Sequence, residues 1–394
     1  MLNIRSSYVK TKEILYTLIH RYQPVARSDL ADISGLTRAS VSNIVKEFLQ
    51  LGLVQESDKK GVGIGRKKVL LKINPKSIHV IGVDIGRRNI VATVYNAGGK
   101  ILRTERLFSP SIKTLHESVE DVKRILSRIL TWTHSKEIHI DAIGIGIPGP
   151  VDPEKGIVHS AHFRGNEIVN LKESIEISCK IPTFVEKDVN AAALGEQWFG
   201  DGKKHDSFVY LLVVEGIGAG MIIDGHLYRG VHDLAGKVGR FVFPAIEENG
   251  KRIFIFEEFG SEISALKFAE ENAIKSKNGY LYTTMQKRQL SIGDLIDGFR
   301  EKDPAAIEAV DSMAYYTAIT VANLVFFADP DLIVIGGDFA GISPRFIQQV
   351  REEVETILNG HPLPELRASP IHDISISLGA ATRAISEVAS KKLS

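Results

Sequence analysis

The sequence predicts a mixed α/β protein with a separate, mostly helical segment at its N-terminus. From residue 80 onward, short runs rich in Val and Ile alternate with longer amphipathic runs, which is the rhythm of an α/β fold. Residues 1–76 instead show three helix-like runs and two short strand-like runs. The two parts also differ in charge: residues 1–76 hold 14 Lys and Arg against 6 Asp and Glu, and the remainder holds 35 against 42. A basic segment joined to an acidic one suggests a module that binds a polyanion.

Composition limits the class of protein further. The chain has 394 residues, too many for one ordinary core, so two or three domains are expected. Its one cysteine, Cys179, excludes a disulfide framework and a cysteine-based zinc cluster, and fits a reducing compartment. No apolar run approaches the ~20 residues of a membrane span, and the first residues lack the apolar stretch of a signal peptide. The sequence therefore predicts a cytoplasmic protein without a membrane segment.

Two short helices are expected first. Apolar residues recur at helical spacing over residues 11–22, and Pro24 ends that run. Ser28 can cap a second helix over residues 28–34, which stops at Gly35.

The third helix carries the main functional signal of this segment. Thr37 can cap a helix over residues 37–52, whose apolar stripe consists of Val41, Ile44, Val45, Phe48 and Leu49. A short helix, a Gly turn and a longer helix form a helix-turn-helix pattern, whose second helix enters the DNA major groove by its N-terminal end. The polar residues at that end that we expect to contact DNA are Thr37, Arg38, Ser40, Ser42, Asn43 and Lys46.

A wing is expected to follow. Two short strands surround a tip rich in Gly and Lys over residues 58–65. Gly65, Arg66 and Lys67 are expected to contact phosphates, which would supply salt-dependent affinity without reading sequence. A module of the same shape that docks onto another protein is the alternative.

The rest of the chain alternates between the two kinds of element. Strands are expected over residues 80–85, 89–95, 100–106, 141–147, 183–186, 207–214, 218–224 and 331–337. Helices are expected over residues 118–133, 190–199, 262–274, 305–327, 343–358 and 379–391. Residues 80–102 and 209–230 share one plan of strand, Gly turn, strand, polar turn and strand. Two such copies suggest two lobes with a ligand cleft between them.

These residues resemble the ROK family, which contains sugar kinases and sugar-responsive repressors. The matching stretches are GVDIG at 82–86, GIGIPGPVD at 144–152, VEKDVNAAALGE at 185–196, GIGAGMIIDGHLYRG at 216–230, LAGKVGR at 234–240 and VIGGDFA at 334–340. The resemblance implies a duplicated actin-like (ribonuclease H-like) two-lobed α/β domain behind the winged helix. We accordingly expect a DNA-binding domain over residues 1–76, a first lobe over 77–190 and a second lobe with a dimerisation surface over 191–394.

Within this resemblance, Asp188 occupies the position of the kinase base. The family's phosphate loops are altered, because Arg87 and Arg88 follow the first Gly turn and Val214 and Glu215 precede the second. A carboxylate ~4 Å from a phosphate charge costs several kcal/mol at a protein-surface dielectric. The sequence therefore predicts no catalysis and no nucleotide cofactor, with an ATP-dependent sugar kinase that uses Asp188 as its base as the alternative.

The metal and ligand positions of the family are also changed. The zinc-binding His of the family is replaced by Arg240, and the loop after it contains no cysteine, so no metal is expected. The sugar-binding positions correspond here to Lys187, Asp188, Lys237, Arg240 and Glu257. Either the three cations hold a negatively charged effector, or they neutralise the two carboxylates in a pocket for a neutral sugar or polyol, or in no pocket at all.

The combined prediction is a DNA-binding repressor of carbohydrate-utilisation genes. A small sugar, polyol or sugar derivative would bind between the lobes of a homodimer or homotetramer and move two winged helices out of register with a palindromic operator. The sequence leaves open whether the effector releases DNA or promotes its binding.

Overall fold

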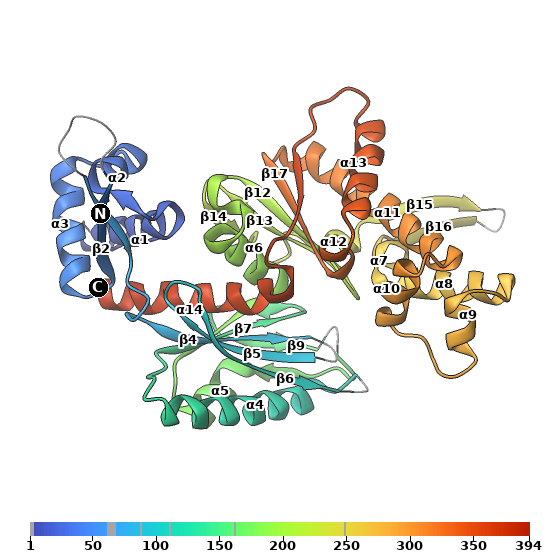
Figure 1. Ribbon diagram of the computed structural model, residues 1–394, viewed down its shortest axis with the longest axis horizontal. Coiled ribbons are helices and arrows are strands. Elements are labelled where there is room, and N and C mark those ends of the chain that lie inside the picture. Colours follow the sequence, from blue (N-terminus) through green and yellow to red (C-terminus); the bar gives the residue numbers. More distant parts are fainter. Residues whose placement is uncertain (1–3, 61–67, 87–88, 110–111, 161–162, 248–249) are drawn as a thin grey trace. The chain divides into compact units, whose positions relative to one another are not determined.

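The computed structural model describes residues 4–60, 68–86, 89–109, 112–160, 163–247 and 250–394 (Figure 1). They form two compact units, one of residues 1–204 with 374–394 and one of residues 205–373. This division differs from the three expected segments in two respects. Residues 1–76 share a unit with the first α/β segment, and the expected boundary at 190/191 lies within a helix, Asp188–Phe199.

The N-terminal part of unit 1 is a three-helix module with a small sheet. Its antiparallel sheet has the strand order β1-β3-β2. Its elements are α1 (Ile4–Tyr22), β1 (Val25–Ala26), α2 (Arg27–Ser34), α3 (Arg38–Gln50), β2 (Val54–Lys60) and β3 (Lys68–Ile73). This is the order of a winged helix-turn-helix, with β2 and β3 as the strands of the wing.

Local sequence signals explain where α3 lies. The Thr37 side chain accepts a hydrogen bond from the Ser40 amide at 3.2 Å, which caps the helix as expected. Gly35 ends α2 with φ +68°, a conformation that favours glycine. The expected cap of α2 is wrong: α2 begins at Arg27 and has no side-chain cap, while the Ser28 hydroxyl donates to Asp29 Oδ1 at 2.9 Å.

The α/β part of unit 1 contains a five-stranded sheet of order β11-β7-β4-β5-β6. Strands β4, β7 and β11 run parallel, while β5 and β6 continue from β4 as an antiparallel meander. The strands are β4 (His79–Ile85), β5 (Asn89–Asn96), β6 (Ile101–Phe108), β7 (Ala142–Ile147) and β11 (Thr183–Lys187). A smaller antiparallel sheet contains β8 (Val151–Asp152), β9 (Ile157–His159) and β10 (Ile168–Asn170).

Helices pack on this sheet and close its core. They are α4 (Leu115–Ser135), α5 (Leu171–Cys179), α6 (Asp188–Phe199) and the last helix of the chain, α14 (Ser375–Leu393). Figure 1 shows α14 lying along β4 and β7, and it also contacts α6. Glycines allow this closeness, because a Cβ at Gly144 would lie 1.9 Å from the Ala380 oxygen and one at Gly379 would lie 1.6 Å from the Ala191 oxygen. The end of the chain is therefore built into unit 1 by backbone contact.

Unit 2 repeats the sheet topology of unit 1. Its strand order is β18-β17-β12-β13-β14, with β12, β17 and β18 parallel and β13 and β14 as the antiparallel meander. The strands are β12 (Phe208–Val213), β13 (Ile217–Ile223), β14 (His226–Tyr228), β17 (Leu332–Gly336) and β18 (Glu365–Ala368). The internal repeat expected from residues 80–102 and 209–230 is confirmed, because both segments form the central strand and meander of their sheets.

The remaining elements of unit 2 are mostly helical. A hairpin contains β15 (Val242–Glu247) and β16 (Gly250–Ile255). The helices are α7 (Glu257–Gly260), α8 (Glu262–Ser276), α9 (Tyr280–Met285), α10 (Ile292–Arg300), α11 (Pro304–Ala328), α12 (Asp338–Ile342) and α13 (Pro344–Leu358).

Helix α11 is the central helix of unit 2. Among the described residues it is the one helix long and apolar enough to cross a membrane, and 56% of its apolar window is buried within the protein. Its buried residues, among them Ala309, Val310 and Met313, belong to the core of unit 2. An apolar helix that is buried inside a domain has the same composition as a membrane span.

Candidate nucleic-acid interface and effector site

Helix α3 presents a polar face to solvent. Arg38, Ser42, Asn43 and Lys46 are exposed, and Ser40 is partly exposed. Val41, Ile44, Val45 and Phe48 are buried on the opposite side. The exposed face contains the side chains that can form hydrogen bonds to base edges, so the helix is presented as groove binding requires.

Ion pairs hold α2 against the wing strands. Lys68 Nζ on β3 lies 2.7 Å from Asp29 Oδ1 on α2, and Arg27 Nη2 lies 3.1 Å from Glu56 Oε1 on β2. Lys68, the residue after the expected phosphate contacts, thus has an acidic partner. The expected phosphate contacts Gly65, Arg66 and Lys67 lie outside the described residues, so their role stays a prediction.

Two of the expected effector residues lie at the start of α6. Lys187 ends β11 and Asp188 is the first residue of α6, where its Oδ1 accepts a hydrogen bond from the Val189 amide at 2.8 Å. Burial raises the pKa of Asp188, while that hydrogen bond and the charge of Lys187 oppose the rise. Lys187 therefore stabilises the charged form of Asp188, as the neutralising interpretation of these cations requires.

A second carboxyl group interacts with Asp188. Asp84, at the end of β4, has its pKa raised to about 7 by burial and by the charge of Asp188, while Arg106 opposes the rise. Asp84 is not among the effector residues that the sequence predicts, although an acidic residue just before the first Gly turn is visible in the sequence. Asp84 and Asp188 form an acidic pair that can accept hydrogen bonds from the hydroxyls of a ligand.

The other expected effector residues lie in unit 2. Glu257 begins α7, and its Oε2 accepts from the Ile217 amide at 3.4 Å. A Cβ added at Gly239 would lie 2.8 Å from the same oxygen, so Glu257 lies against the turn that carries Lys237 and Arg240. The structure thus brings Lys187 with Asp188, and Glu257 with the 237–240 turn. Whether the two groups share one ligand stays a prediction.

The second Gly turn brings acidic side chains close together. Glu215 lies between β12 and β13, and the Glu262 amide donates to the Val214 oxygen of this turn at 3.0 Å. Glu262 is 3% exposed, and its pKa is raised well above its usual range by burial and then by the charges of Asp338 and Glu215. The charges of Glu215 and Asp338 thus favour the protonated form of Glu262 at this turn. Arg87 and Arg88 lie outside the described residues.

Metal ligands do not gather in the described part of the chain, where no group of three or more His, Cys, Asp or Glu is placed to hold an ion. At the position of the family's zinc-binding His, Lys237 precedes the short helical turn of residues 238–240 and Arg240 ends it. Arginine and lysine side chains are poor zinc ligands, because they remain protonated.

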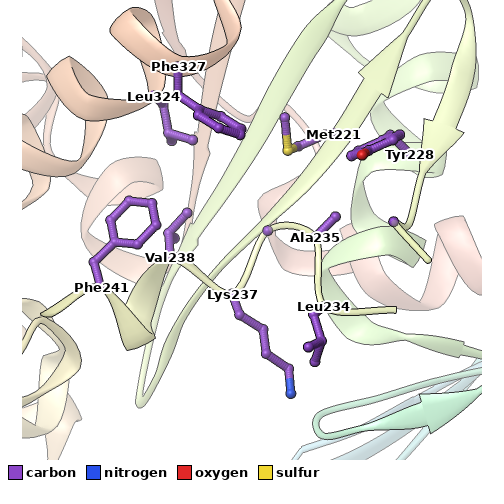
Figure 2. A pocket seen from close by; sticks show the side chains of 11 residues that line it. Met221, Tyr228, Leu234, Ala235, Lys237, Val238, Phe241, Leu324 and Phe327 are labelled. Carbon is purple, nitrogen blue, oxygen red and sulfur yellow. The ribbon is translucent and has the colours of Figure 1, made fainter. Parts of the chain in front are cut away.

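An apolar pocket of about 310 Å³ lies beside Lys237 in unit 2. Met221, Tyr228, Phe241 and Phe327 contribute to its lining, and Figure 2 shows the Lys237 side chain extending away from them. The pocket is therefore lined mainly by apolar side chains, with Lys237 as the charged residue of its lining.

Fold and sites together define the class of this protein: a duplicated actin-like α/β protein of the sugar-kinase type with an N-terminal winged helix. The chain belongs to the ROK family, whose model matches residues 80–386. It is 27% identical to a putative xylose repressor of Caldicellulosiruptor sp. (strain Rt8B.4) over 95% of each chain. It is 26% identical to the xylose repressor of Bacillus subtilis over 88% of this chain and 86% of that one. It is also 26% identical to the DNA-binding transcriptional dual regulator NagC of Escherichia coli, over 87% and 84% of the two chains.

Solved structures show the same fold. A ROK family transcriptional regulator, a homolog of the E. coli MLC protein, matches 98% of both chains with a TM-score of 0.75 at 22% identity. A ROK family glucokinase from Streptomyces griseus, in complex with glucose and AMPPNP, has a TM-score of 0.69 at 25% identity. The glucokinase covers 77% of this chain and is itself covered to 98%. The regulator is thus matched along nearly the whole chain, whereas the kinase leaves about a quarter of this chain unmatched.

Proposed function

We propose that this protein is a sugar-responsive transcriptional repressor that binds DNA through α3 and its wing. The observation that carries the proposal is the exposed polar face of α3, formed by Arg38, Ser42, Asn43 and Lys46 on a helix capped by Thr37. The curated relatives named as repressors support it, because they match this chain over most of its length.

For the effector we propose a neutral sugar or polyol held by Asp188, with Lys187, Lys237, Arg240 and Glu257 as further contacts. The effect of Lys187 on the pKa of Asp188 supports a neutral effector, because the charge of Lys187 already stabilises a carboxylate of the protein itself. Asp84 adds a second hydrogen-bonding carboxyl next to Asp188. The names of the relatives make D-xylose and N-acetyl-D-glucosamine the first ligands to test.

The mechanism we propose requires more than one copy of the chain. Two winged helices of a homodimer, or of a homotetramer, would bind half-sites about one DNA turn or a multiple apart. Sugar binding would favour a conformation in which the two α3 helices no longer fit this spacing, provided that the sugar binds the two conformations with different affinity. Such a protein acts where the genome is, in the cytoplasm, and needs no cofactor.

We also propose that the chain does not transfer phosphate. The carboxylate of Glu215 in the second Gly turn supports this, because a triphosphate placed beside it would be repelled. The sugar kinase remains the second candidate, since Asp188 is retained and kinases share the fold. Incubation with ATP, Mg²⁺ and D-glucose, D-xylose or N-acetyl-D-glucosamine should release no ADP. Turnover that disappears in Asp188→Asn would establish the kinase instead.

DNA binding tests the repressor directly. The full-length protein is used to select duplexes from a random pool, and the anisotropy of a labelled selected duplex is then measured with and without each sugar. We expect a palindromic selected sequence and an affinity that at least one sugar lowers by tenfold or more. A protein that selects no sequence, or whose weak DNA binding ignores salt, would support the protein-docking alternative.

A further inference from the structure

Helix α6 connects the candidate effector site to the winged helix. Its first residue is Asp188 and its last two residues are Trp198 and Phe199. At 1.5 Å per residue its 12 residues span about 18 Å. A helix of this length behaves as a rigid element, so a displacement at Asp188 reaches the aromatic end.

That end packs against α1 in a cluster that we call the aromatic joint, formed by Tyr16, His20, Phe48, Trp198 and Phe199. The Trp198 and His20 rings stack with centroids 4.2 Å apart and planes 29° apart. Tyr16 meets Trp198 edge to face at 6.4 Å and His20 at 5.0 Å. Tyr16, His20 and Trp198 are at most 3% exposed, so the contact excludes solvent.

The joint reaches the DNA-binding helix itself. Tyr16 contacts Phe48 of α3 edge to face at 6.1 Å, and Phe48 is fully buried. Aromatic pairs have preferred geometries, and such a pair adds ~0.5–1.5 kcal/mol to the burial of its surface. A tilt of Trp198 would therefore change the packing beneath α3.

Helix α14 provides a second connection between the same elements. It contacts α6 through Gly379, where a Cβ would lie 1.6 Å from the Ala191 oxygen. At its other end, Lys12 of α1 donates to the Leu393 oxygen at 2.9 Å and pairs with Glu47 of α3 at 2.6 Å. Lys12 thus links α1, α3 and the C-terminal end of α14. Both α6 and α14 therefore contact the winged helix.

The joint contains buried polar atoms that an apolar core of its size would lack. Within the described residues, neither ring nitrogen of His20 has a hydrogen-bond partner. Burial lowers the pKa of His20 to about 3, with Lys203 as a smaller cause, so the ring is neutral at physiological pH. Buried polar atoms without partners cost free energy that water would return when the joint opens. The unpartnered nitrogens of His20 therefore make it easier for the aromatic joint to open than for a fully apolar contact of the same size.

We propose that α6, through the stack of Trp198 on His20, transmits occupancy of the Asp188 end to the orientation of the winged helix. This inference rests on the proposed function, because it concerns how the effector site and the DNA-binding site are coupled. Trp198 and His20 are positioning residues, and they contact neither sugar nor DNA. The expected signature is a loss of coupling between two binding events that each survive.

The test compares the parent with His20→Phe, Trp198→Leu and, as a control on α4, Trp132→Phe. For each protein the affinity for the selected duplex is measured without sugar and with saturating D-xylose or N-acetyl-D-glucosamine. The sugar used is the one that changes the DNA affinity of the parent. Sugar affinity is measured separately by calorimetry. We expect both joint variants to keep sugar affinity within about threefold while the ratio of the two DNA affinities falls at least tenfold. A ratio that equals that of the parent in both variants overturns the inference and leaves the proposed function standing.

A second measurement needs no substitution in the joint. The chain has 2 tryptophans, so Trp132→Phe leaves Trp198 as the single tryptophan, whose emission is excited selectively over that of tyrosine. Addition of the selected duplex alone should shift or quench its emission, because coupling is reciprocal. If no sugar changes DNA binding by the parent, the proposed regulation by sugar fails. The emission of Trp198 with and without DNA then shows by itself whether the aromatic joint responds to DNA binding. Emission that is unchanged by DNA overturns the inference.

Discussion

In unit 1, different side chains serve the two proposed functions, DNA binding and effector binding. Asn43 lies exposed on α3, where it can form paired hydrogen bonds with an adenine edge. Asp84 and Asp188, in contrast, are largely shielded from solvent, and burial raises the pKa of both carboxyls. Exposure suits a residue that reads a partner, and a perturbed carboxyl suits a residue that binds a small ligand.

Removal of the Asn43 side chain should relax sequence preference. Asn43→Ala is expected to lower affinity for the selected duplex by ~1–3 kcal/mol and to leave affinity for a scrambled duplex nearly unchanged. Fluorescence anisotropy with both duplexes measures the difference. Gln50→Ala, exposed at the far end of the same helix, is the matched control. Equal losses on the two duplexes would assign Asn43 to the DNA backbone or to the fold.

The raised pKa of Asp84 predicts a pH-dependent cost to the folded state. The folded chain holds this proton more tightly than the unfolded chain, so stability from this group falls as pH rises from 3.8 to about 7. Asp84→Asn should therefore melt above the parent at pH 8, and the difference should shrink toward pH 5. Each ~1 kcal/mol corresponds to about 2–4 °C for a domain of this size. Calorimetry measures it, with exposed Glu154→Gln as control; a difference independent of pH would exclude titration as the cause.

At the scale of elements, the interior of unit 1 depends on close helix packing. Gly144 on β7 and Gly379 on α14 permit backbone contacts that a single methyl group would prevent. Overpacking of a tight interface typically costs ~1–3 kcal/mol. The same contacts join α14 to α6, so they matter for the proposed coupling as well as for stability.

Gly379→Ala should destabilise unit 1 by roughly 1–3 kcal/mol despite the better helix propensity of alanine. Urea unfolding followed by circular dichroism measures the change. Ser386→Ala, a half-buried position on the same helix, should stay within about 0.5 kcal/mol of the parent. A Gly379→Ala protein as stable as the parent would mean that α14 can move away from α6 at little cost.

For the whole molecule, charge is distributed by part. The 14 basic and 6 acidic residues of positions 1–76 oppose the acidic balance of the rest, although the chain as a whole has a net charge of +1. Long-range attraction to DNA is therefore a property of the winged helix, while the rest of the chain repels phosphates.

Salt dependence tests this arrangement. Lys67→Ala should weaken binding to selected and scrambled duplexes about equally and reduce the slope of log affinity against log salt by ~1. Titrations at several salt concentrations give the slope. Lys100→Ala, in the turn between β5 and β6 and outside the winged helix, should leave it unchanged. A slope unaffected by Lys67→Ala would remove the wing from the interface.

The sequence alone determined much of this protein, because many signals are local. Thr37, Gly35 and the spacing of Val41, Ile44, Val45 and Phe48 act within a few residues, so they place α3 and expose Asn43 correctly. The internal repeat is likewise local, since each copy is a meander joined by short turns. Ser28 failed as a cap because the chain enters α2 directly from β1, whose pairing with β3 no local pattern shows.

Only the tertiary structure decided which distant residues meet. The last helix, α14, joins the first unit, Trp198 stacks on His20, and Glu262 and Asp338 gather near Glu215. Each of these contacts pairs residues far apart in the chain, and hydrophobic or helical periodicity carries no information about such partners. Burial then changes their chemistry, since the same carboxyl or imidazole titrates differently once neighbours from other elements exclude water.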